Sequence, residues 1–430
     1  MPESLTPAQQ ALAARTDRFI AEQLRPLGLR RRAHAAAGSD DAIGAARDEA
    51  AFRAAVVAAS REAGLFAMTQ PASHGGTEAG TLELTLVRER LAASGEVSRR
   101  YVFGPGPGVL AGVTGELART HLEPLLCGEK RSAFAFTEAS GAAPTAARQD
   151  GSDWVVTGSK SYVTGGVEAD FFVVVATIQA TDTETAVAER GAQRAAESGT
   201  ESGTESGTER GKERGTETAA SAGGPRGAIM LVVDADDPGV HRSPPFRSMD
   251  GSTHVAITLD GVRVPGQRVI GRPGEGMPRA LRQIGDVRVS VAAEACGLMQ
   301  CALAHLETHL RAPHRSGGTL GDREGVRLRF ADARIEAYAA RSMLYRTARL
   351  VDSGANAINE GIATKVFATE AAGRVIDTAL QLEGGQALVQ GHLLERLYRE
   401  VRALRLAEGA SDVLRLNLAR GRLELDKGTL

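Results

Sequence analysis

The chain has 430 residues, of which 42% are hydrophobic and 24% are charged, and its formal net charge is −2. This is the composition of an ordinary globular protein with room for two or three domains, and so small a charge provides no field for nucleic acid or anionic lipid. Aromatic residues make up only 4% of the chain, which argues against a stacking platform for single-stranded nucleic acid. Three cysteines are too few for a disulfide framework and predict a reducing cytoplasm. We expect neither a signal sequence nor a transmembrane span.

Residues 5–130 are predicted to be mostly helical. Apolar residues recur there at spacings of three and four in two stretches: Phe52, Val56, Ala59 and Ala63, and then Leu84, Val87 and Leu91. This period places each set on one face of a helix.

The middle of the chain has the pattern of short strands. Five runs are rich in β-branched or aromatic residues and are bounded by Gly, Pro or Asp: 133–138, 153–166, 170–178, 227–234 and 253–265. At this density they predict a small antiparallel β-barrel or sandwich. A polar stretch at 181–224, with the tandem repeat "ESGTESGTESGT" at 197–208, interrupts them and is expected to be a disordered insertion.

From about residue 275 the helical period returns. Leu328, Ala331, Ile335 and Tyr338 form one stripe, and Ile362, Val366, Gly373, Ile376 and Leu380 form another. We therefore predict an α+β fold that is mostly α: an N-terminal helical domain (1–130), a middle β domain (131–272, with the 181–224 insertion) and a C-terminal four-helix bundle (273–430).

Several isolated sequence patterns are not interpreted as functional sites. Cys296, Cys301 and His305 lie on one predicted helix but lack a fourth ligand, so they are interpreted as buried small residues and no metal site is predicted. The glycines of "GPGPGVLAG" (104–112) follow no convincing strand, and the prolines remove amide donors that a phosphate needs. His74 stands in a glycine turn that requires no catalytic role.

Six stretches, in order, resemble motifs of the acyl-CoA dehydrogenase family, over roughly residues 50–424. They are "FAFTEA" (134–139), "TGSKSYVTG" (157–165), "DGVRVPGQRVIG" (260–271), "RVSVAAEACGLMQCAL" (288–303), "QLEGG" (381–385) and "AEGASDVLRL" (407–416). The helix, β, helix order predicted above is also that of this family.

The resemblance implies an FAD site. It places Phe134, Phe136 and Thr137 on one side of the isoalloxazine, and Tyr162, Val163 and Thr164 on the other, with the Thr164 hydroxyl near the reactive flavin nitrogen. It also implies that Gln381, Gly384 and Gly385 approach the adenine end of an FAD held by a neighbouring subunit, and that Ala143 and Arg315 lie at positions of phosphate-end contacts.

The resemblance implies that Glu408 is the base that removes the α-proton of a thioester, a task for a poorly hydrated but ionised carboxylate. Arg288 would lie near the nucleotide or pantetheine of the acyl carrier, and Gly409 would let the chain pass close to the substrate. The enolate oxygen would receive hydrogen bonds from the Glu408 amide and a ribityl hydroxyl. Without the resemblance, Glu408 would be interpreted as an acidic charge at a helix N-terminus.

Some positions depart from the family pattern. Ala143 and Pro144 replace a serine and an acid, and Pro313 replaces an arginine, with Arg311 and Arg315 two residues to either side. Tyr162 replaces a tryptophan, Ala410 replaces a threonine, and the usual glutamine after the arginine is assigned to Glu324. Most of these changes weaken contacts to FAD phosphates and adenine, at about 1.5–3 kcal/mol for each charge-assisted bond.

The sequence thus predicts a cytoplasmic, homotetrameric enzyme of fatty acid metabolism that dehydrogenates an acyl thioester, carried by CoA or by an acyl carrier protein, with FAD. An electron-transferring flavoprotein is the expected electron acceptor. Two alternatives stay open: a flavin oxidase or monooxygenase on the same scaffold, and a cofactor-poor, non-catalytic paralogue that acts as a subunit. Acyl chain length and branching are left undetermined.

Overall fold

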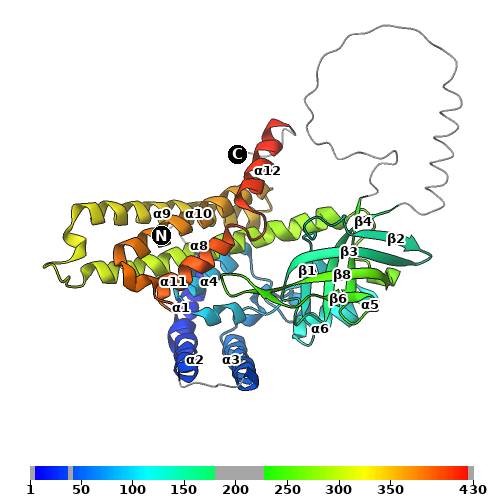
Figure 1. The fold of residues 1–430 in the computed structure, drawn as a ribbon, viewed down its shortest axis with the longest axis horizontal. Coiled ribbons are helices and arrows are strands. Elements are labelled where there is room, and N and C mark those ends of the chain that lie inside the picture. Colours follow the sequence, from blue (N-terminus) through cyan, green and yellow to red (C-terminus); the bar gives the residue numbers. More distant parts are fainter. Residues whose placement is uncertain (1–4, 37–41, 180–226, 425–430) are drawn as a thin grey trace, which may run out of the picture. The chain divides into compact units, whose positions relative to one another are not determined.

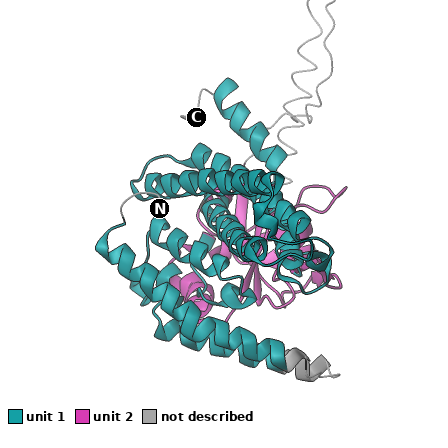
Figure 2. Ribbon diagram, turned by 90° about the vertical axis from the view of Figure 1, so that its left-hand side faces the viewer, with its two compact units in different colours: residues 1–108, 248–251, 282–430 teal, residues 109–247, 252–281 magenta. Residues whose placement is uncertain are grey.

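The computed structural model describes residues 5–36, 42–179 and 227–424 (Figure 1). The fold is mostly helical with one curled sheet, which confirms the predicted α+β class. The chain divides into two compact units: unit 1 contains residues 1–108, 248–251 and 282–430, and unit 2 contains residues 109–247 and 252–281 (Figure 2). The three-domain division drawn from the sequence stays a prediction, and the 181–224 insertion lies outside the described residues.

The N-terminal part of unit 1 is helical, as predicted. Its elements are α1 (Pro7–Phe19), η1 (Ile20–Leu24), α2 (Arg25–Ala36), α3 (Ala42–Glu62), η2 (Phe66–Thr69), η3 (Ala72–His74), α4 (Thr81–Ala93) and η4 (Val97–Tyr101). Thr6 and Gln9 form a capping box that satisfies backbone donors at the start of α1. Val56, Val87 and Leu91 are buried in the core, as the helical period predicts.

The C-terminal part of unit 1 is a bundle of long helices. They are α8 (Gly276–Arg311, in unit 1 from residue 282), η8 (Leu320–Asp322), α9 (Glu324–Asp352), α10 (Ile358–Glu383), η9 (Gly385–Leu388), α11 (Leu393–Leu404) and α12 (Ser411–Leu423). The stripe on α10 is buried: Ile362, Val366, Ile376 and Leu380 are each at most 8% exposed.

The stripe predicted on α9 faces outward instead. Leu328, Ile335 and Tyr338 are 60%, 64% and 72% exposed. The helix buries its alanine-rich face, which includes Ala337 and Ala340, because small side chains let neighbouring helices pack closely. The spacing of apolar residues along a helix does not by itself show which face of the helix is buried.

By length and composition alone, α8 is long and apolar enough to cross a membrane, which was not anticipated from the sequence. In the structure this helix is a core helix. Ala292, Cys296, Leu298, Met299 and Ala302 have no exposed surface. Its apolar character is therefore explained by burial within the bundle.

Unit 2 contains a single eight-stranded sheet. The strands are β1 (Ser132–Ala135), β2 (Ala146–Asp150), β3 (Asp153–Thr164), β4 (Phe171–Ile178), β5 (Ala228–Asp234), β6 (Val240–Arg242), β7 (Phe246–Arg247) and β8 (Thr253–Val264). They are paired in the order β1-β4-β2-β3-β8-β6, with β5 on β4 and β7 on β8. All five predicted strands are present, whereas the short strands β2, β6 and β7 carry too little pattern to be predicted.

The sheet is mixed rather than wholly antiparallel, so that part of the prediction is wrong. Both β1 and β2 pair in parallel with β4: the β2–β3 hairpin is the crossover between β1 and β4, and β3 is the crossover between β2 and β4. Strand β4 is buried on both faces: Phe172 and Val174 belong to one core cluster, and Phe171 and Val173 to another. Helical segments α5 (Gly115–Leu117), η6 (Ala118–Leu122) and α6 (Glu123–Cys127), with η5 (Gly108–Leu110) before them and η7 (Gly266–Arg268) after β8, complete the elements.

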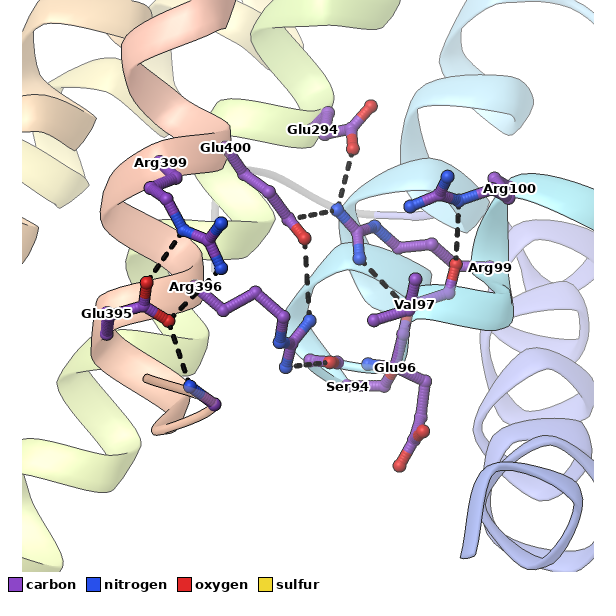
Figure 3. A network of polar contacts seen from close by, with 12 residues as sticks. Ser94, Glu96, Val97, Arg99, Arg100, Glu294, Glu395, Arg396, Arg399 and Glu400 are labelled. Carbon is purple, nitrogen blue, oxygen red and sulfur yellow. Dashed lines mark hydrogen bonds and ion pairs between the residues drawn. The ribbon is translucent and has the colours of Figure 1, made fainter. Parts of the chain in front are cut away.

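Two polar networks fasten helices of unit 1 to one another. Arg99, next to α4, donates hydrogen bonds to Glu294 of α8 (2.9 Å) and Glu400 of α11 (2.7 Å), and Arg396 donates to the Gly95 carbonyl at 2.7 Å (Figure 3). Burial by itself would lower the pKa of Arg99, but the carboxylates of Glu400 and Glu294 more than offset it and raise that pKa. This network fixes the position of α11.

The second network joins α4 to α9 around a buried carboxylate. Arg341 donates to both oxygens of Glu89 at 2.6 and 3.1 Å, and the Tyr345 hydroxyl donates to Glu89 at 2.5 Å. The Glu89 side chain is only 3% exposed, so its charge depends on these partners for compensation.

We predict that Arg341→Met destabilises the protein by about 3–5 kcal/mol, because it leaves the Glu89 charge buried without its cation. The double variant Glu89→Gln/Arg341→Met removes both charges and is expected to recover most of that loss. Denaturant unfolding followed by far-UV circular dichroism measures both changes. A single variant within 1 kcal/mol of the wild type, a margin well below the cost of breaking a buried pair, would contradict this prediction.

Candidate active site

The predicted base, Glu408, lies in the turn between α11 and α12. Its backbone has φ of +54°, and the following Gly409 has φ of +104°. A glutamate in the left-handed region is strained, by about 1–3 kcal/mol, and persists only where its surroundings hold it. Gly409 is required here because its φ disfavours any side chain and a Cβ would meet Leu414 at 3.0 Å.

A buried lysine holds this turn. Lys365 of α10 has no exposed surface, and its Nζ donates to the carbonyls of Arg405 (3.1 Å) and Gly409 (2.8 Å). Arg288 of α8 is also buried, and its Nε donates to the Glu408 carbonyl at 3.3 Å. Two cations from two helices thus fix the backbone on both sides of the Glu408 side chain.

The charged groups of this cluster shift one another's pKa values. Burial raises the pKa of Glu408, while Arg288 and Lys365 act in the opposite direction. Burial and the nearby Arg288 lower the pKa of Lys365 to about 8, although Glu408 and Glu370 partly oppose this. Burial also lowers the pKa of Arg288. Glu408 is therefore a carboxylate of increased basicity that its two cations still keep ionisable.

We predict that the titration of Lys365 makes stability rise with pH between about 8 and 10.5. The unfolded lysine keeps its proton up to about 10.5 whereas the folded one loses it near 8, so the unfolded state binds more protons across this window and stability increases, by about 3 kcal/mol at most. Denaturant midpoints from pH 7.5 to 10.5 measure this, and Lys365→Gln is expected to lack the increase.

The chain contains only five lysines, so a matched control is available. Lys130→Gln removes a lysine outside the cluster and is expected to keep the wild-type pH dependence. Identical pH profiles for Lys365→Gln and the wild type would show that Lys365 does not titrate in this window.

In unit 2 the two segments predicted to face the flavin ring lie side by side. The Ser161 amide donates to the Thr137 carbonyl at 2.9 Å, and the Ala139 amide donates to the Ser159 carbonyl at 3.1 Å. The buried Lys160 donates to Glu138 Oε1 (2.6 Å) and to the Phe136 carbonyl (3.2 Å). Burial lowers the pKa of Lys160, which Glu138 partly opposes.

The end of β3 presents a strained, exposed aromatic residue. Tyr162 has φ of +54° and is 64% exposed, with its ring edge-on to Phe246. The Thr164 hydroxyl lies 3.1 Å from His254 Nδ1. Between them, the side chain of Val163 is buried in the sheet, so only its backbone is left to contact a ligand.

The remaining predicted cofactor residues differ in their surroundings. Phe134 and Phe136 are stacked and half-buried, with ring centroids 5.7 Å apart. Ala143 is exposed in the loop before β2, and Arg315 is exposed in the loop between α8 and α9.

The residues predicted to contact the adenine of FAD line one cavity. Gln381, Gly384 and Gly385 line a cavity of about 560 Å³, together with Met249, Asp377, Leu380, Leu388, Glu395, Tyr398 and Arg399. Arg315 does not line it. Gly384 ends α10 with φ of +87°, which favours glycine.

Three polar residues of these clusters were not identified from the sequence: Lys160, Lys365 and His254. The signal available for the two lysines was a single cation inside an apolar, small-residue stretch. For His254 no local signal exists, because its bond to Thr164 joins strands 90 positions apart.

The chain is similar to several known proteins. The family model described as "Acyl-CoA dehydrogenase, C-terminal domain" matches residues 274–423. The chain is 26% identical to 3-(aryl)acrylate reductase of Clostridium sporogenes, over 86% of this chain and 90% of the relative. It is 25% identical to CarC, a subunit of the caffeyl-CoA reductase-Etf complex of Acetobacterium woodii, over 81% and 84%. The structure of butyryl-CoA dehydrogenase from Megasphaera elsdenii has the same fold, with a TM-score of 0.73, 21% identity and coverage of 99% and 100%.

These relatives carry the names of dehydrogenases and reductases, which are oxidoreductases acting on CH–CH bonds, and the predicted class of enzyme is thereby confirmed. The family model over residues 274–423 and these relatives together support the predicted resemblance to the acyl-CoA dehydrogenase family.

Proposed function

We propose that this protein is an FAD-dependent dehydrogenase that forms an α,β-double bond in an acyl thioester, with Glu408 as the base. The observation that carries the proposal is the state of Glu408: a carboxylate made more basic by burial, in a strained backbone conformation, and braced by two buried cations. Backbone strain of this kind accumulates at functional sites. Of the three non-glycine residues with positive φ in the described ranges, two are the predicted site residues Tyr162 and Glu408.

The residues at the predicted cofactor positions fit a flavin. The 560 Å³ cavity beside Gly384 and Gly385 is concave and partly apolar, as a site for an adenine requires. The paired Thr137 and Ser161 segments leave Tyr162 exposed at their edge. When bound, FAD would supply the acceptor for the hydride that leaves the β-carbon.

The groups around Glu408 suit removal of an α-proton. The raised pKa of Glu408 increases its affinity for the proton, while Arg288 and Lys365 stabilise the ionised form that must be present first. Among the described residues, the Glu408 amide has no hydrogen-bond acceptor. That amide is therefore available to stabilise the negative oxygen of the enolate, and Gly409 leaves space beside it.

The acyl carrier, the electron acceptor and the assembly belong to the same proposal. The substrate is an acyl-CoA or an acyl-carrier-protein thioester, and Arg288, which donates to the Glu408 carbonyl, is assigned to the side of the site that holds the carrier's nucleotide or pantetheine. An electron-transferring flavoprotein accepts the electrons, as the name of the Acetobacterium woodii relative supports. The proposed assembly is a cytoplasmic homotetramer, and the exposed apolar side chains of Leu328, Ile335 and Tyr338 on α9 support an interface between copies of the chain.

We predict that acyl thioesters bleach the flavin of the wild type under anaerobic conditions, and that Glu408→Gln reduces the bleaching rate by at least about 10²-fold, the contribution of a positioned general base. The amide keeps the shape of the side chain but cannot accept the proton. Stopped-flow absorbance with a panel of straight and branched acyl thioesters measures the rates.

Glu129→Gln, which changes an exposed glutamate of unit 2, is the matched control and is expected to bleach at the wild-type rate. An unchanged rate in Glu408→Gln would show that Glu408 is not the base. Rapid oxygen consumption by the reduced wild type would favour the oxidase or monooxygenase alternative.

We predict that the purified protein binds about one flavin per chain, because the segments proposed to face the ring lie side by side and the residues proposed to face the adenine line one cavity. The visible spectrum and the flavin-to-protein ratio of freshly prepared protein measure this. A colourless protein that also fails to bind added FAD would instead support the non-catalytic paralogue, for which the exposed Ala143 and Pro313 are the evidence.

A further inference from the structure

Three helix ends of unit 1 bring two histidines and a glutamate together. His305 belongs to the C-terminal third of α8, Glu383 is the last residue of α10, and His392 is the N-cap of α11. His305 Nε2 lies 2.8 Å from Glu383 Oε2, and His392 Nε2 lies 3.0 Å from Glu383 Oε1. The sequence placed His305 beside Cys301, but in the structure its partners come from two other helices.

The carboxylate at the centre of this cluster is largely withdrawn from water. The side chain of Glu383 is 8% exposed, whereas those of His305 and His392 are 31% and 18% exposed. Within the described residues, no arginine or lysine forms an ion pair with Glu383. A buried carboxylate whose partners are imidazoles lacks the fixed positive charge that such a group usually has.

The three side chains provide the donors that a transition-metal ion prefers. One ligand atom from each of them lies within 4.8 Å of the other two. Around a tetrahedral ion with bonds of about 2.0–2.2 Å, ligand atoms lie about 3.3–3.6 Å apart, which side-chain rotation can reach from a spacing within 4.8 Å. Two imidazole nitrogens and one carboxylate form a common ligand set for Zn²⁺, with water at the remaining position, and the partial exposure of the histidines gives an ion a route in.

Binding an ion would change one existing bond. His392 Nδ1 accepts a hydrogen bond from the Leu394 amide at 3.3 Å, so Nε2 carries the proton that points to Glu383. An ion on Nε2 requires this proton to move to Nδ1, which gives up the cap of α11. In return, the Glu383 carboxylate would pair with the positive charge of the bound ion.

We propose that His305, Glu383 and His392 form a binding site for a divalent transition-metal ion of the zinc class, which links the ends of α8, α10 and α11. The site adjoins the cavity lined by Gly384 and Gly385, because Glu383 directly precedes these glycines. The ion has a structural role: it holds the turn after α10, and it takes no part in the proposed dehydrogenation.

The test is a Zn²⁺ titration of the full chain after treatment with a chelator. Equilibrium dialysis with metal analysis, and isothermal titration calorimetry, are expected to give one tightly bound Zn²⁺ per chain and an increase in the melting temperature. Ca²⁺ and Mg²⁺, which prefer oxygen ligands, are expected to produce neither effect.

Three variants locate the ion. His392→Asn removes the imidazole but keeps a good N-cap for α11, and His305→Gln and Glu383→Gln remove the other two ligands. Each is expected to weaken Zn²⁺ binding at least tenfold. His314→Asn, a histidine in the loop after α8 and outside the cluster, is the matched control and is expected to bind like the wild type.

The absence of stoichiometric Zn²⁺ binding by the wild type would overturn the proposal and leave the cluster as a hydrogen-bonded link between helices. Unchanged binding in His305→Gln or His392→Asn would equally overturn it, because the ion would then lie elsewhere. Circular dichroism identifies a variant that fails to fold, and the other folded variants then decide. Flavin content and bleaching are measured on the same samples, so a failure of this site is distinguishable from a failure of the proposed enzyme activity.

Discussion

The candidate site of unit 1 depends on one buried ammonium group. Lys365 has no exposed surface and donates to the carbonyls of Arg405 and Gly409. These two bonds close the turn on both sides of Glu408, whose backbone would otherwise relax from the left-handed region. The Arg405 carbonyl also accepts from the Ser411 amide at 3.2 Å, so the same atom fixes the start of α12. Removing a cation from water costs free energy. Here the buried ammonium group of Lys365 holds the backbone on both sides of Glu408 in place.

A buried lysine that binds a backbone carbonyl is also present in unit 2. Lys160 is 1% exposed and donates to Glu138 and to the Phe136 carbonyl, and it thereby holds the segment that carries Thr137 against β3. Tyr162, two residues further on, also has a positive φ. In both units a buried lysine binds backbone carbonyls, two for Lys365 and one for Lys160, close in the sequence or in space to a residue with positive φ. Such bonds set positions accurately because, in a medium of low dielectric constant, breaking them leaves a charge without a partner.

Much of the fold was predictable from periodicity, and the reasons for the failures are physical. Long helices and strands such as β4 have unambiguous patterns, because they bury one face or both. The outward orientation of Leu328 and Tyr338 on α9 was not predictable, since the period shows that a face exists but not what covers it. Parallel pairing of β1 with β4 depends on topology, which local propensity does not encode.

The residues of the candidate site also fall into two groups: those that the sequence indicated and those that it did not. Glu408 and the glycines after α10 were identified because the family resemblance marks them by short, contiguous motifs. Lys365, His254 and Glu383 act through contacts with residues 9 to 90 positions away. Pairings of this kind arise only when the chain folds, so a single sequence contains the participants but not their association.

The hairpin of β4 and β5 also has a practical consequence. Thr177 pairs with Ala228, and the Ile178 amide donates to the Gly227 carbonyl at 3.2 Å, so the chain leaves and re-enters the sheet at adjacent points. The register of the two strands is set by their seven paired residues and by the core on both sides of β4. Because closing a longer loop costs free energy only logarithmically, an affinity tag or a fluorescent reporter inserted directly after Gln179 is expected to leave this register unchanged.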